Sequence, residues 1–236
     1  SAALAPAAQA ANFTVDTLDD PGNGDTCAAT DCSLREAIAD ADANTEADTI
    51  TFASGLTGTI TLTSPLEVGS PEGIDIDGPG VSVVSISGDT DSSGDPGPGD
   101  TPILYVLPDA KVSISGLTLT EGYIDCSCFG KYAGGISMSP GSTVSIADAA
   151  LTDNIGTTGG AVANYQGTLD VTRTELSGNY SDYLGGAIFA SGPKYTPTPT
   201  PGEGEPMTTT IANSELVGNG APIGGGAWLS GAKYTS

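Results

Sequence analysis

Histidine is absent from this sequence of 236 residues, and lysine and arginine together number only six. Clusters of lysine and arginine are what bind phosphate groups, so a nucleic acid or an anionic membrane surface is excluded as a partner. The lack of histidine removes the commonest general base and the usual nitrogen ligand of zinc. No apolar run reaches the ~18 residues that a membrane-spanning helix needs, so we expect none.

Acidic residues are abundant by contrast. The 29 Asp and Glu residues give a formal net charge of −23, concentrated in the first half of the chain. Two interpretations stay open: the charge keeps the protein soluble in a salty or extracellular medium, or it serves a function that depends on divalent cations. The 34 glycines and 16 prolines, beside 38% apolar residues, indicate a folded, turn-rich β protein.

The four cysteines form two close pairs in polar loops, Cys27 with Cys32 and Cys126 with Cys128. Such pairs favour disulfides and therefore an oxidising compartment. A bridge from Cys27 to Cys32 closes a comfortable local loop, whereas a bridge across the single residue between Cys126 and Cys128 would strain the backbone. A zinc site would need both pairs close together in space.

The N-terminal segment, residues 1–10, is rich in alanine and resembles the end of a secretory leader. Its last three residues, Ala8-Gln-Ala10, form a small-x-small cleavage motif, and cleavage there would leave Ala11 first. The alternative is an N-terminal arm that packs on the body or on a neighbouring molecule.

Residues 11–48 predict an N-terminal cap. An apolar alternation over residues 12–18 favours a strand. Ser33 and Glu36 then have the spacing of a capping box at a helix start. An apolar stripe follows at Leu34, Ala37, Ile38 and Ala41. We expect this short helix to cover the open end of a stack of strands.

Four segments in this part of the chain form a recognisable set: Phe13-Thr-Val15, Cys32-Ser-Leu-Arg-Glu-Ala37, Asp48-Thr-Ile-Thr-Phe52 and Gly58-Thr-Ile-Thr-Leu62. The set resembles the bacterial CSLREA-type N-terminal region and covers residues 12–90. The resemblance implies a secreted protein with a parallel β-helix body, in some cases anchored at the cell surface. It transfers no catalytic residues.

From residue 49 onward the pattern predicts short strands separated by Gly, Pro, Asp and Ser, and no plain hairpins. The expected strands in the first part are 49–52, 59–62, 73–76, 81–86, 103–107 and 112–114. In the second part Gly159-Gly-Ala-Val162 recurs as Gly185-Gly-Ala-Ile188 and Gly225-Gly-Ala-Trp228, with an imperfect copy at Gly134-Gly-Ile136.

Asparagines follow the same repeat. Asn154, Asn179 and Asn219 each stand three residues after a leucine, at separations of 25 and 40. A period of about 25 residues is one coil of a solenoid. We therefore predict an all-β right-handed parallel β-helix over residues 49–236. Insertions are expected at its corners near 89–101, 123–132 and 193–207, and the asparagines form a structural ladder along the axis.

One acidic loop has the spacing of an EF-hand-type calcium loop. Asp89, Asp91 and Ser93 stand at positions 1, 3 and 5, a glycine stands at position 6, and Asp95 and Asp100 follow, the latter at position 12. Asp replaces the usual Glu at position 12, and no helices flank the loop. The sequence predicts calcium here, with a solvated acidic loop as the alternative.

Parallel β-helix enzymes cleave polysaccharides with carboxylates, often beside a positioned Arg or Lys. Here Arg35 is more simply read as an ion pair with the adjacent Glu36 of the helix, and Arg173 as a surface ion pair near Glu175 and Asp170. We assign no catalytic residue and do not expect an enzyme. Tyrosines in loops of the second half can stack on sugars: Tyr165, Tyr180, Tyr183 and Tyr195.

The sequence thus favours an extracellular or cell-surface structural or adhesive protein. Trp228 and Leu229 look like core residues of a last coil without a cap, which suggests a head-to-tail filament or surface-layer subunit whose partner is itself. The alternative is a β-helix that binds or cleaves carbohydrate, with surface glycans as the partner.

Overall fold

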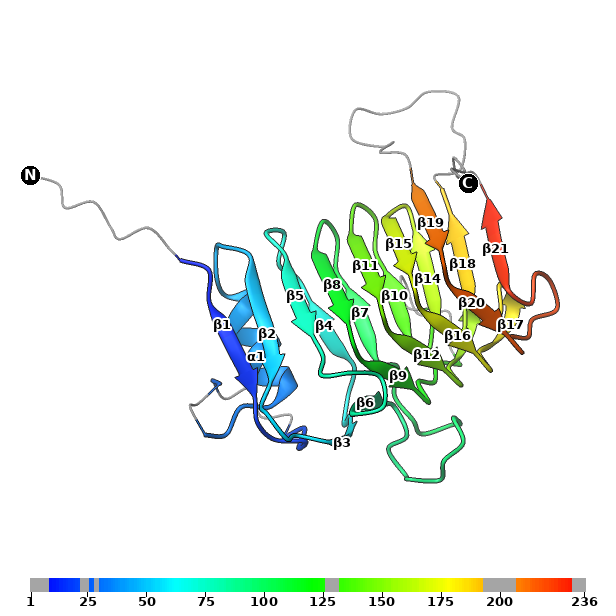
Figure 1. Ribbon diagram of the computed structural model, residues 1–236. Coiled ribbons are helices and arrows are strands. Elements are labelled where there is room, and N and C mark those ends of the chain that lie inside the picture. The colour runs from blue at the N-terminus through cyan, green and yellow to red at the C-terminus, as the bar shows by residue number, and fades with distance from the viewer. Residues whose placement is uncertain (1–8, 22–25, 28–29, 126–131, 193–206, 231–236) are drawn as a thin grey trace, which may run out of the picture.

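The computed structural model describes residues 9–21, 26–27, 30–125, 132–192 and 207–230. Apart from the helix α1 (Leu34–Asp42), the elements in this part of the chain are strands, and every pairing between them is parallel. The strands stack one behind another from the N-terminal to the C-terminal end of the molecule (Figure 1). The prediction of an all-β protein built on parallel sheets is confirmed.

Three long sheets run along this stack. The first sheet contains, in order, β1 (Asn12–Val15), β2 (Asp48–Phe52), β5 (Ile74–Asp77), β8 (Lys111–Ser115), β11 (Thr143–Ala147), β15 (Thr168–Thr172) and β19 (Thr208–Ala212). The second contains β3 (Gly58–Thr61), β6 (Val84–Ser87), β9 (Thr118–Thr120), β12 (Ala150–Thr152), β16 (Glu175–Ser177) and β20 (Glu215–Val217). The third contains β4 (Leu66–Val68), β7 (Leu104–Val106), β10 (Ile136–Met138), β14 (Val162–Tyr165), β18 (Ile188–Ser191) and β21 (Ala227–Ser230).

A small fourth sheet joins β13 (Ile155–Thr158) to β17 (Tyr180–Leu184) beside the third. From β2 onward the chain enters the three long sheets in rotation, and each strand pairs with the strands before and after it in its sheet, while the strand at either end of a sheet pairs on one side. Val144, for example, pairs with Val112 on one side and with Leu169 on the other. The predicted alignment of these repeats is confirmed.

Alternation along the strands forms the core. Val144 and Ile146 of β11 are buried, and Ser145 between them faces outward. Because successive side chains of a strand point to opposite faces, the inward residues of all three sheets meet in one apolar cluster. Each fully buried Val, Leu or Ile contributes about 2 kcal/mol relative to an exposed one.

The last copy of the Gly-Gly repeat is shifted by one residue from the predicted alignment. Ile188 pairs with Ala227, so Trp228 pairs with Phe189 and faces outward. A slip of one residue moves a side chain to the opposite face of a sheet. The prediction that Trp228 is a core residue is therefore wrong, whereas Leu229 does pack against the core.

The corners between strands of different sheets use left-handed backbone conformations, as the glycine pairs predict. Gly159 and Gly185 have φ of +67° and +65°. Asp148, Arg173 and Asn213 adopt φ of 50–53° at a second corner, between the first and second sheets. Such a conformation costs an L-residue about 1 kcal/mol, so the packing and pairing of the flanking strands must hold it in place.

The helix α1 lies at the N-terminal end of the stack, beside β1 and β2 (Figure 1). Ser33 caps it, and the predicted capping box with Glu36 is present. The stripe of Leu34, Ala37, Ile38 and Ala41 is buried. The preceding strand β1 ends at Val15, three residues before the predicted end at residue 18.

Candidate functional site

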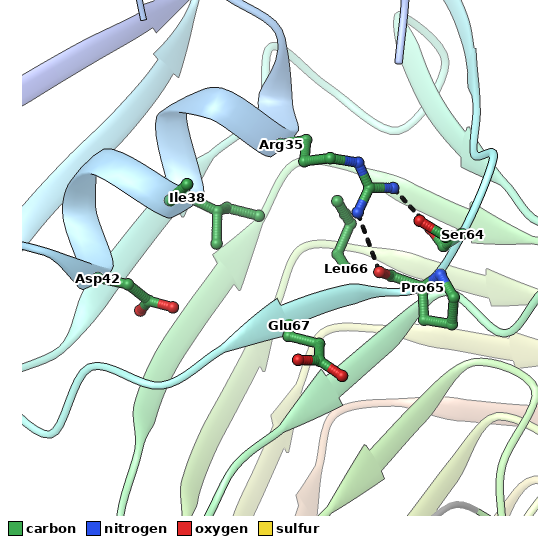
Figure 2. A pocket seen from close by; sticks show the side chains of 8 residues that line it. Arg35, Ile38, Asp42, Ser64, Pro65, Leu66 and Glu67 are labelled. Atoms are coloured by element: carbon green, nitrogen blue, oxygen red, sulfur yellow. Dashed lines mark hydrogen bonds between the residues drawn. The ribbon is translucent and has the colours of Figure 1, made fainter. Parts of the chain in front are cut away.

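A depression of about 410 Å³ lies between α1 and β4 at the N-terminal end. Figure 2 shows Arg35 facing the segment that contains Ser64 and Pro65, and Asp42 at the other end of the helix. Arg35 donates to the backbone oxygens of both, at 2.6 Å from Ser64 and 3.0 Å from Pro65. Asp42 accepts from the backbone N–H of Gly69 at 2.9 Å and of Ser70 at 2.8 Å.

Asp20 completes this network from the other side. Both of its carboxylate oxygens bind the Arg35 guanidinium, at 2.7 and 2.8 Å, and it also accepts from the backbone N–H of Thr63 at 2.7 Å. The side chain of Asp20 is only 2% exposed. The predicted pairing of Arg35 with Glu36 is therefore wrong. The Glu36 carboxylate accepts from the backbone N–H of Ser33 in the capping box, and Arg35 binds Asp20 and the backbone before β4.

The pKa values of Asp20 and Asp42 shift in opposite directions. Burial opposes ionisation of Asp20, but the hydrogen bonds from Arg35 and Thr63 outweigh it and lower the pKa of Asp20. Burial raises the pKa of Asp42, and its bonds from the Gly69 and Ser70 amides offset that only in part. The polar groups lining this depression are thus engaged with the fold itself, which makes it a structural seam.

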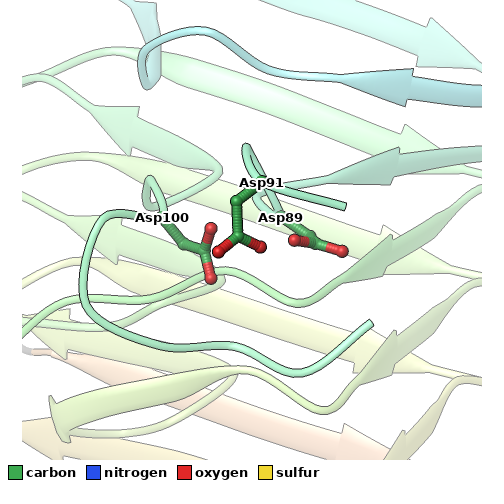
Figure 3. Close-up of side chains that lie close together, drawn as sticks. All are labelled: Asp89, Asp91 and Asp100. Atoms are coloured by element: carbon green, nitrogen blue, oxygen red, sulfur yellow. The ribbon is translucent and has the colours of Figure 1, made fainter. Parts of the chain in front are cut away.

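The acidic loop between β6 and β7 gathers three carboxylates. Ligand oxygens of Asp89, Asp91 and Asp100 all lie within 4.8 Å of one another. Figure 3 shows the three side chains converging although Asp100 comes from the far end of the loop. The predicted ligand Asp95 does not join this group, because its carboxylate lies outside that distance.

Hydrogen bonds from the loop backbone hold these carboxylates. Asp89 accepts from the N–H groups of Gly94 at 2.8 Å and Ser93 at 3.0 Å, and the Gly94 bond is the largest cause that lowers the pKa of Asp89. Asp100 accepts from the N–H of Thr90 at 2.9 Å and of Gly97 at 2.8 Å. The Ser93 hydroxyl donates to the backbone oxygen of Asp95. Three carboxylates of like charge thus converge with backbone amides and hydroxyls as their donors, an arrangement that a hard cation would stabilise.

A second depression, of about 260 Å³, adjoins this loop and shares Asp100 with it. Two phenols line it, Tyr105 and Tyr123, together with Asp125. Burial and the charge of Glu67 raise the pKa of Tyr105 to about 12. Burial and the neighbouring carboxylates, Asp125 first, also raise the pKa of Tyr123. Both phenols therefore keep their protons, so they can donate hydrogen bonds but cannot act as bases near neutral pH.

The three predicted asparagines form a ladder at the corner after the second sheet. Asn154 donates from its backbone N–H and its side-chain Nδ2 to Oδ1 of Asn179, at 3.1 and 3.0 Å. Asn179 donates in the same way to Asn219, at 3.0 Å in each case. The Nδ2 atoms also donate to the backbone oxygens of Leu119, Leu151 and Leu176 in turn. At the start of the ladder stands Gly122, whose backbone N–H donates to Oδ1 of Asn154.

Aromatic rings form a row along the outer side of the third sheet. Centroid distances are 4.4 Å from Tyr132 to Tyr165, 5.0 Å from Tyr165 to Phe189 and 5.0 Å from Phe189 to Trp228. The rings of Phe189 and Trp228 are stacked in parallel, so each covers one face of the other. The repeat places Tyr165, Phe189 and Trp228 on successive paired strands, but the row was missed because the predicted alignment put Trp228 in the core.

Two other tyrosines are open to solvent. Tyr180 and Tyr183 of β17 are 44% and 62% exposed, and Ile223 beside them is 58% exposed. We call these three residues the corner patch. Tyr195 lies outside the described residues.

The remaining predicted residues divide as follows. Cys27 and Cys32 form the predicted disulfide, whereas Cys126 and Cys128 lie outside the described residues. Arg173 forms a surface ion pair as predicted, but its partner is Asp148 of the preceding coil, not Glu175 or Asp170. More than half of each of these two side chains is exposed.

Comparison with protein-family models, with curated proteins and with solved structures finds no match for this chain. Within the described part of the chain, no helix combines the length and the apolarity that crossing a membrane requires.

Proposed function

We propose that this chain is an extracellular structural or adhesive protein whose body is a right-handed parallel β-helix. The observation that carries the proposal is the repetition of core, corner and amide ladder from one turn of the chain to the next. Strands that pair only with neighbouring turns build a stiff, quasi-one-dimensional body. The resemblance of residues 12–90 to the CSLREA-type region and the Cys27–Cys32 disulfide support a secreted, oxidising location.

The N-terminal end favours a capped stalk over a head-to-tail filament. An exposed strand edge pairs readily with another chain, and proteins prevent this by covering the edge or placing charges there. Arg35 and Asp42 bind the backbone on either side of β4, and Asp20 binds the backbone after β3. A second molecule that added its strands here would first have to break these bonds.

Electron microscopy of the purified protein, together with light scattering over a range of concentrations, tests this form of the proposal. We expect separate, elongated particles with the mass of one chain. Filaments that grow with concentration would overturn the capped stalk and support the head-to-tail subunit. A compact particle, measured by small-angle X-ray scattering, would contradict the β-helix body itself.

The corner patch favours a second candidate function, the binding of surface glycans. Exposed tyrosines offer ring faces for sugars, and Tyr180 and Tyr183 are exposed whereas the rings of the aromatic row are buried or half-buried. Titration with bacterial and host polysaccharides in affinity electrophoresis tests it. Tyr183→Ala should reduce retardation, and Val81→Ala, which changes another exposed apolar side chain, should not. Retardation that is equal in both variants would remove the patch from the proposal.

We also propose that the acidic loop binds calcium through Asp89, Asp91 and Asp100, and that the Ser93 hydroxyl beside Asp89 supplies a further oxygen. The convergence of the three carboxylates supports this assignment. Calcium would stiffen the loop beside the Tyr105–Tyr123 depression, as is common in extracellular modules.

A further inference from the structure

Asp48, the first residue of β2, has an unusual environment. Its side chain is buried, with only 2% of the residue exposed. Its Oδ1 atom accepts from the backbone N–H of Ala11 at 2.6 Å and from Nδ2 of Asn44 at 3.0 Å. Its Oδ2 atom is buried without a hydrogen-bond partner, and no other side-chain atom in the described residues shares that condition.

A buried carboxylate oxygen without a donor is costly, and such groups in native proteins call for an explanation. The neighbouring backbone N–H groups already have partners: that of Asp48 donates to the carbonyl of Gly73, and that of Thr49 donates to the carbonyl of Ala11. The position of Ala11 against Asp48 is therefore fixed by the pairing of β1 with β2. What the site lacks is one more donor, at the nitrogen of Ala11 or next to it.

The bond that precedes this nitrogen is the one that the small-x-small motif marks for cleavage. Ala8 and Ala10 are small, Gln9 stands between them, and the next residue is Ala11. Gln9 and Ala10 are both exposed, and β1 begins only at Asn12, so the Ala10–Ala11 bond lies outside the sheet. Two independent features, one in the sequence and one in the fold, thus meet at a single atom.

We propose that an endopeptidase hydrolyses the Ala10–Ala11 bond and that the new α-ammonium group of Ala11 forms a buried ion pair with Asp48. Water adds across the amide: its oxygen goes to the carbonyl carbon of Ala10, which leaves as a carboxylate, and both of its protons go to the nitrogen of Ala11. The nitrogen then carries three N–H donors in place of one. One keeps the present bond to Oδ1, and another reaches Oδ2.

Asn44 acts as a positioning residue for this pair. Its Oδ1 accepts from the N–H of Thr45 at 2.8 Å, which directs Nδ2 toward Asp48. The same Nδ2 atom lies 3.3 Å from the carbonyl oxygen of Gln9, a contact that ends when the leader segment departs. Nδ2 of Asn44 would then donate to Asp48 alone.

Processing would in this way be coupled to folding. The uncleaved chain leaves Asp48 half satisfied, whereas the cleaved chain completes the site and locks β1 onto β2. The inference goes beyond the proposed function. It depends on export only in that export brings the chain to a leader peptidase. The ion pair itself can be tested in solution wherever the protein resides.

The first experiment compares forms of the protein that begin at Ser1, Ala10 and Ala11, released from a removable N-terminal tag. We expect the form that begins at Ala11 to unfold at the highest temperature, by about 3–8 °C in a domain of this size. The form that begins at Ala10 carries the same charge one residue away and should match the form that begins at Ser1. Equal unfolding temperatures for the Ala10 and Ala11 forms would overturn the ion pair.

Asp48→Asn in each form separates a role for the ammonium group from a general packing role. The substitution should lower the unfolding temperature of the Ala11 form much more than that of the Ser1 form, and Asp75→Asn, at an exposed position on the next strand, should change neither. An equal loss in both forms would contradict the pairing. If Asp48→Asn prevents folding, acylation of the wild-type amines decides: the Ala11 amine should react more slowly than the Ala10 amine, and equal rates would overturn the proposal.

The processing step has its own test. Mass spectrometry of the protein recovered from the medium of a secreting bacterium should show a chain that begins at Ala11. A mature chain that keeps Gln9 and Ala10 would overturn the cleavage. A chain that stays inside the cell would contradict the extracellular function and would leave the solution comparison as the test of the ion pair.

Discussion

The side-chain amide of Asn154 donates a hydrogen bond to Oδ1 of Asn179 over 3.0 Å, and neither residue exposes any surface to solvent. The two residues are 25 positions apart in the sequence, one turn of the chain. Because the backbone N–H of Asn154 donates to the same oxygen, a single side chain satisfies two buried donors of the preceding turn. The ladder thus fixes which turn of the chain packs against which neighbouring turn.

Replacing Asn179 by alanine removes the middle of this ladder. The backbone N–H and Nδ2 of Asn154 lose their acceptor, and the carbonyl of Leu151 loses a donor. Leaving buried polar groups unsatisfied costs about 1–3 kcal/mol each, partly offset by local rearrangement. We expect Asn179→Ala to lower the free energy of unfolding by about 2–4 kcal/mol, measured by urea denaturation.

Asn12→Ala is the matched control, because Asn12 is exposed on β1 and its change should stay within about 0.5 kcal/mol. Asn219→Ala should fall between the two, since Asn219 is only partly buried. Equal losses for Asn12→Ala and Asn179→Ala would contradict the role of the ladder.

Much of this arrangement could be predicted from the sequence, because a repeat places equivalent residues at equivalent points. The pairing of Val144 with Val112 and Leu169 follows from spacing alone. The alignment failed at Trp228, where an extra glycine let the motif match in two registers. Only the pairing of Ile188 with Ala227 decides between them.

The N-terminal seam could not be predicted in the same way. Asp20, Arg35 and Thr63 are brought together by loops that no repeat relates, so the sequence gives no spacing rule for them. The adjacent Glu36 looked like the natural partner of Arg35, but a capping carboxylate is already committed to the helix N-terminus. The lone acceptor on Asp48 was hidden for the same reason, since it depends on two strands 37 residues apart.

The Asp20–Arg35 pair should stabilise the fold in a pH-dependent way. The pKa of Asp20 is lowered in the folded chain, so its contribution is present above the unfolded value of about 3.9 and is lost as pH falls through the lower folded value. We expect Asp20→Asn to cost about 3 kcal/mol at pH 7 because it leaves Arg35 partly unpaired. The difference from the wild type should shrink toward pH 3, as measured by urea denaturation at both pH values.

Asp148→Asn provides the matched control for that experiment. Asp148 also pairs with an arginine, and the hydrogen bond from Arg173 lowers its pKa, but both side chains are more than half exposed. Exposed pairs contribute little, so Asp148→Asn should leave the unfolding curve unchanged at either pH. A loss that matches that of Asp20→Asn would show that burial of the pair is not what matters.

The Cys27–Cys32 disulfide ties the start of α1 to the loop before it across a separation of five residues. A loop this short restricts the unfolded chain only modestly, so the double variant Cys27→Ser/Cys32→Ser should lose about 2 kcal/mol. Thermal unfolding with and without reductant measures this loss. Wild-type protein that unfolds at the same temperature in both conditions would contradict a stabilising bridge.

Calcium should order the acidic loop. Carboxylate oxygens of Asp89, Asp91 and Asp100 converge within 4.8 Å, and a divalent cation between them would replace their mutual repulsion with attraction. We expect isothermal titration calorimetry to show one calcium site with a dissociation constant of about 10⁻⁴ to 10⁻³ M, the range of extracellular modules. Limited proteolysis within residues 90–99 should slow when calcium is added and recover with chelator.

Asp100→Asn tests the part of this site that joins the two ends of the loop. Asp100 binds the amides of Thr90 and Gly97 through its two oxygens, and an asparagine keeps the size of the side chain while removing its charge. The calcium affinity should fall at least tenfold, whereas Asp75→Asn, which removes an exposed carboxylate from β5, should leave it unchanged. If both substitutions weaken binding equally, the cation responds to the overall charge of −23 and not to the three converging carboxylates.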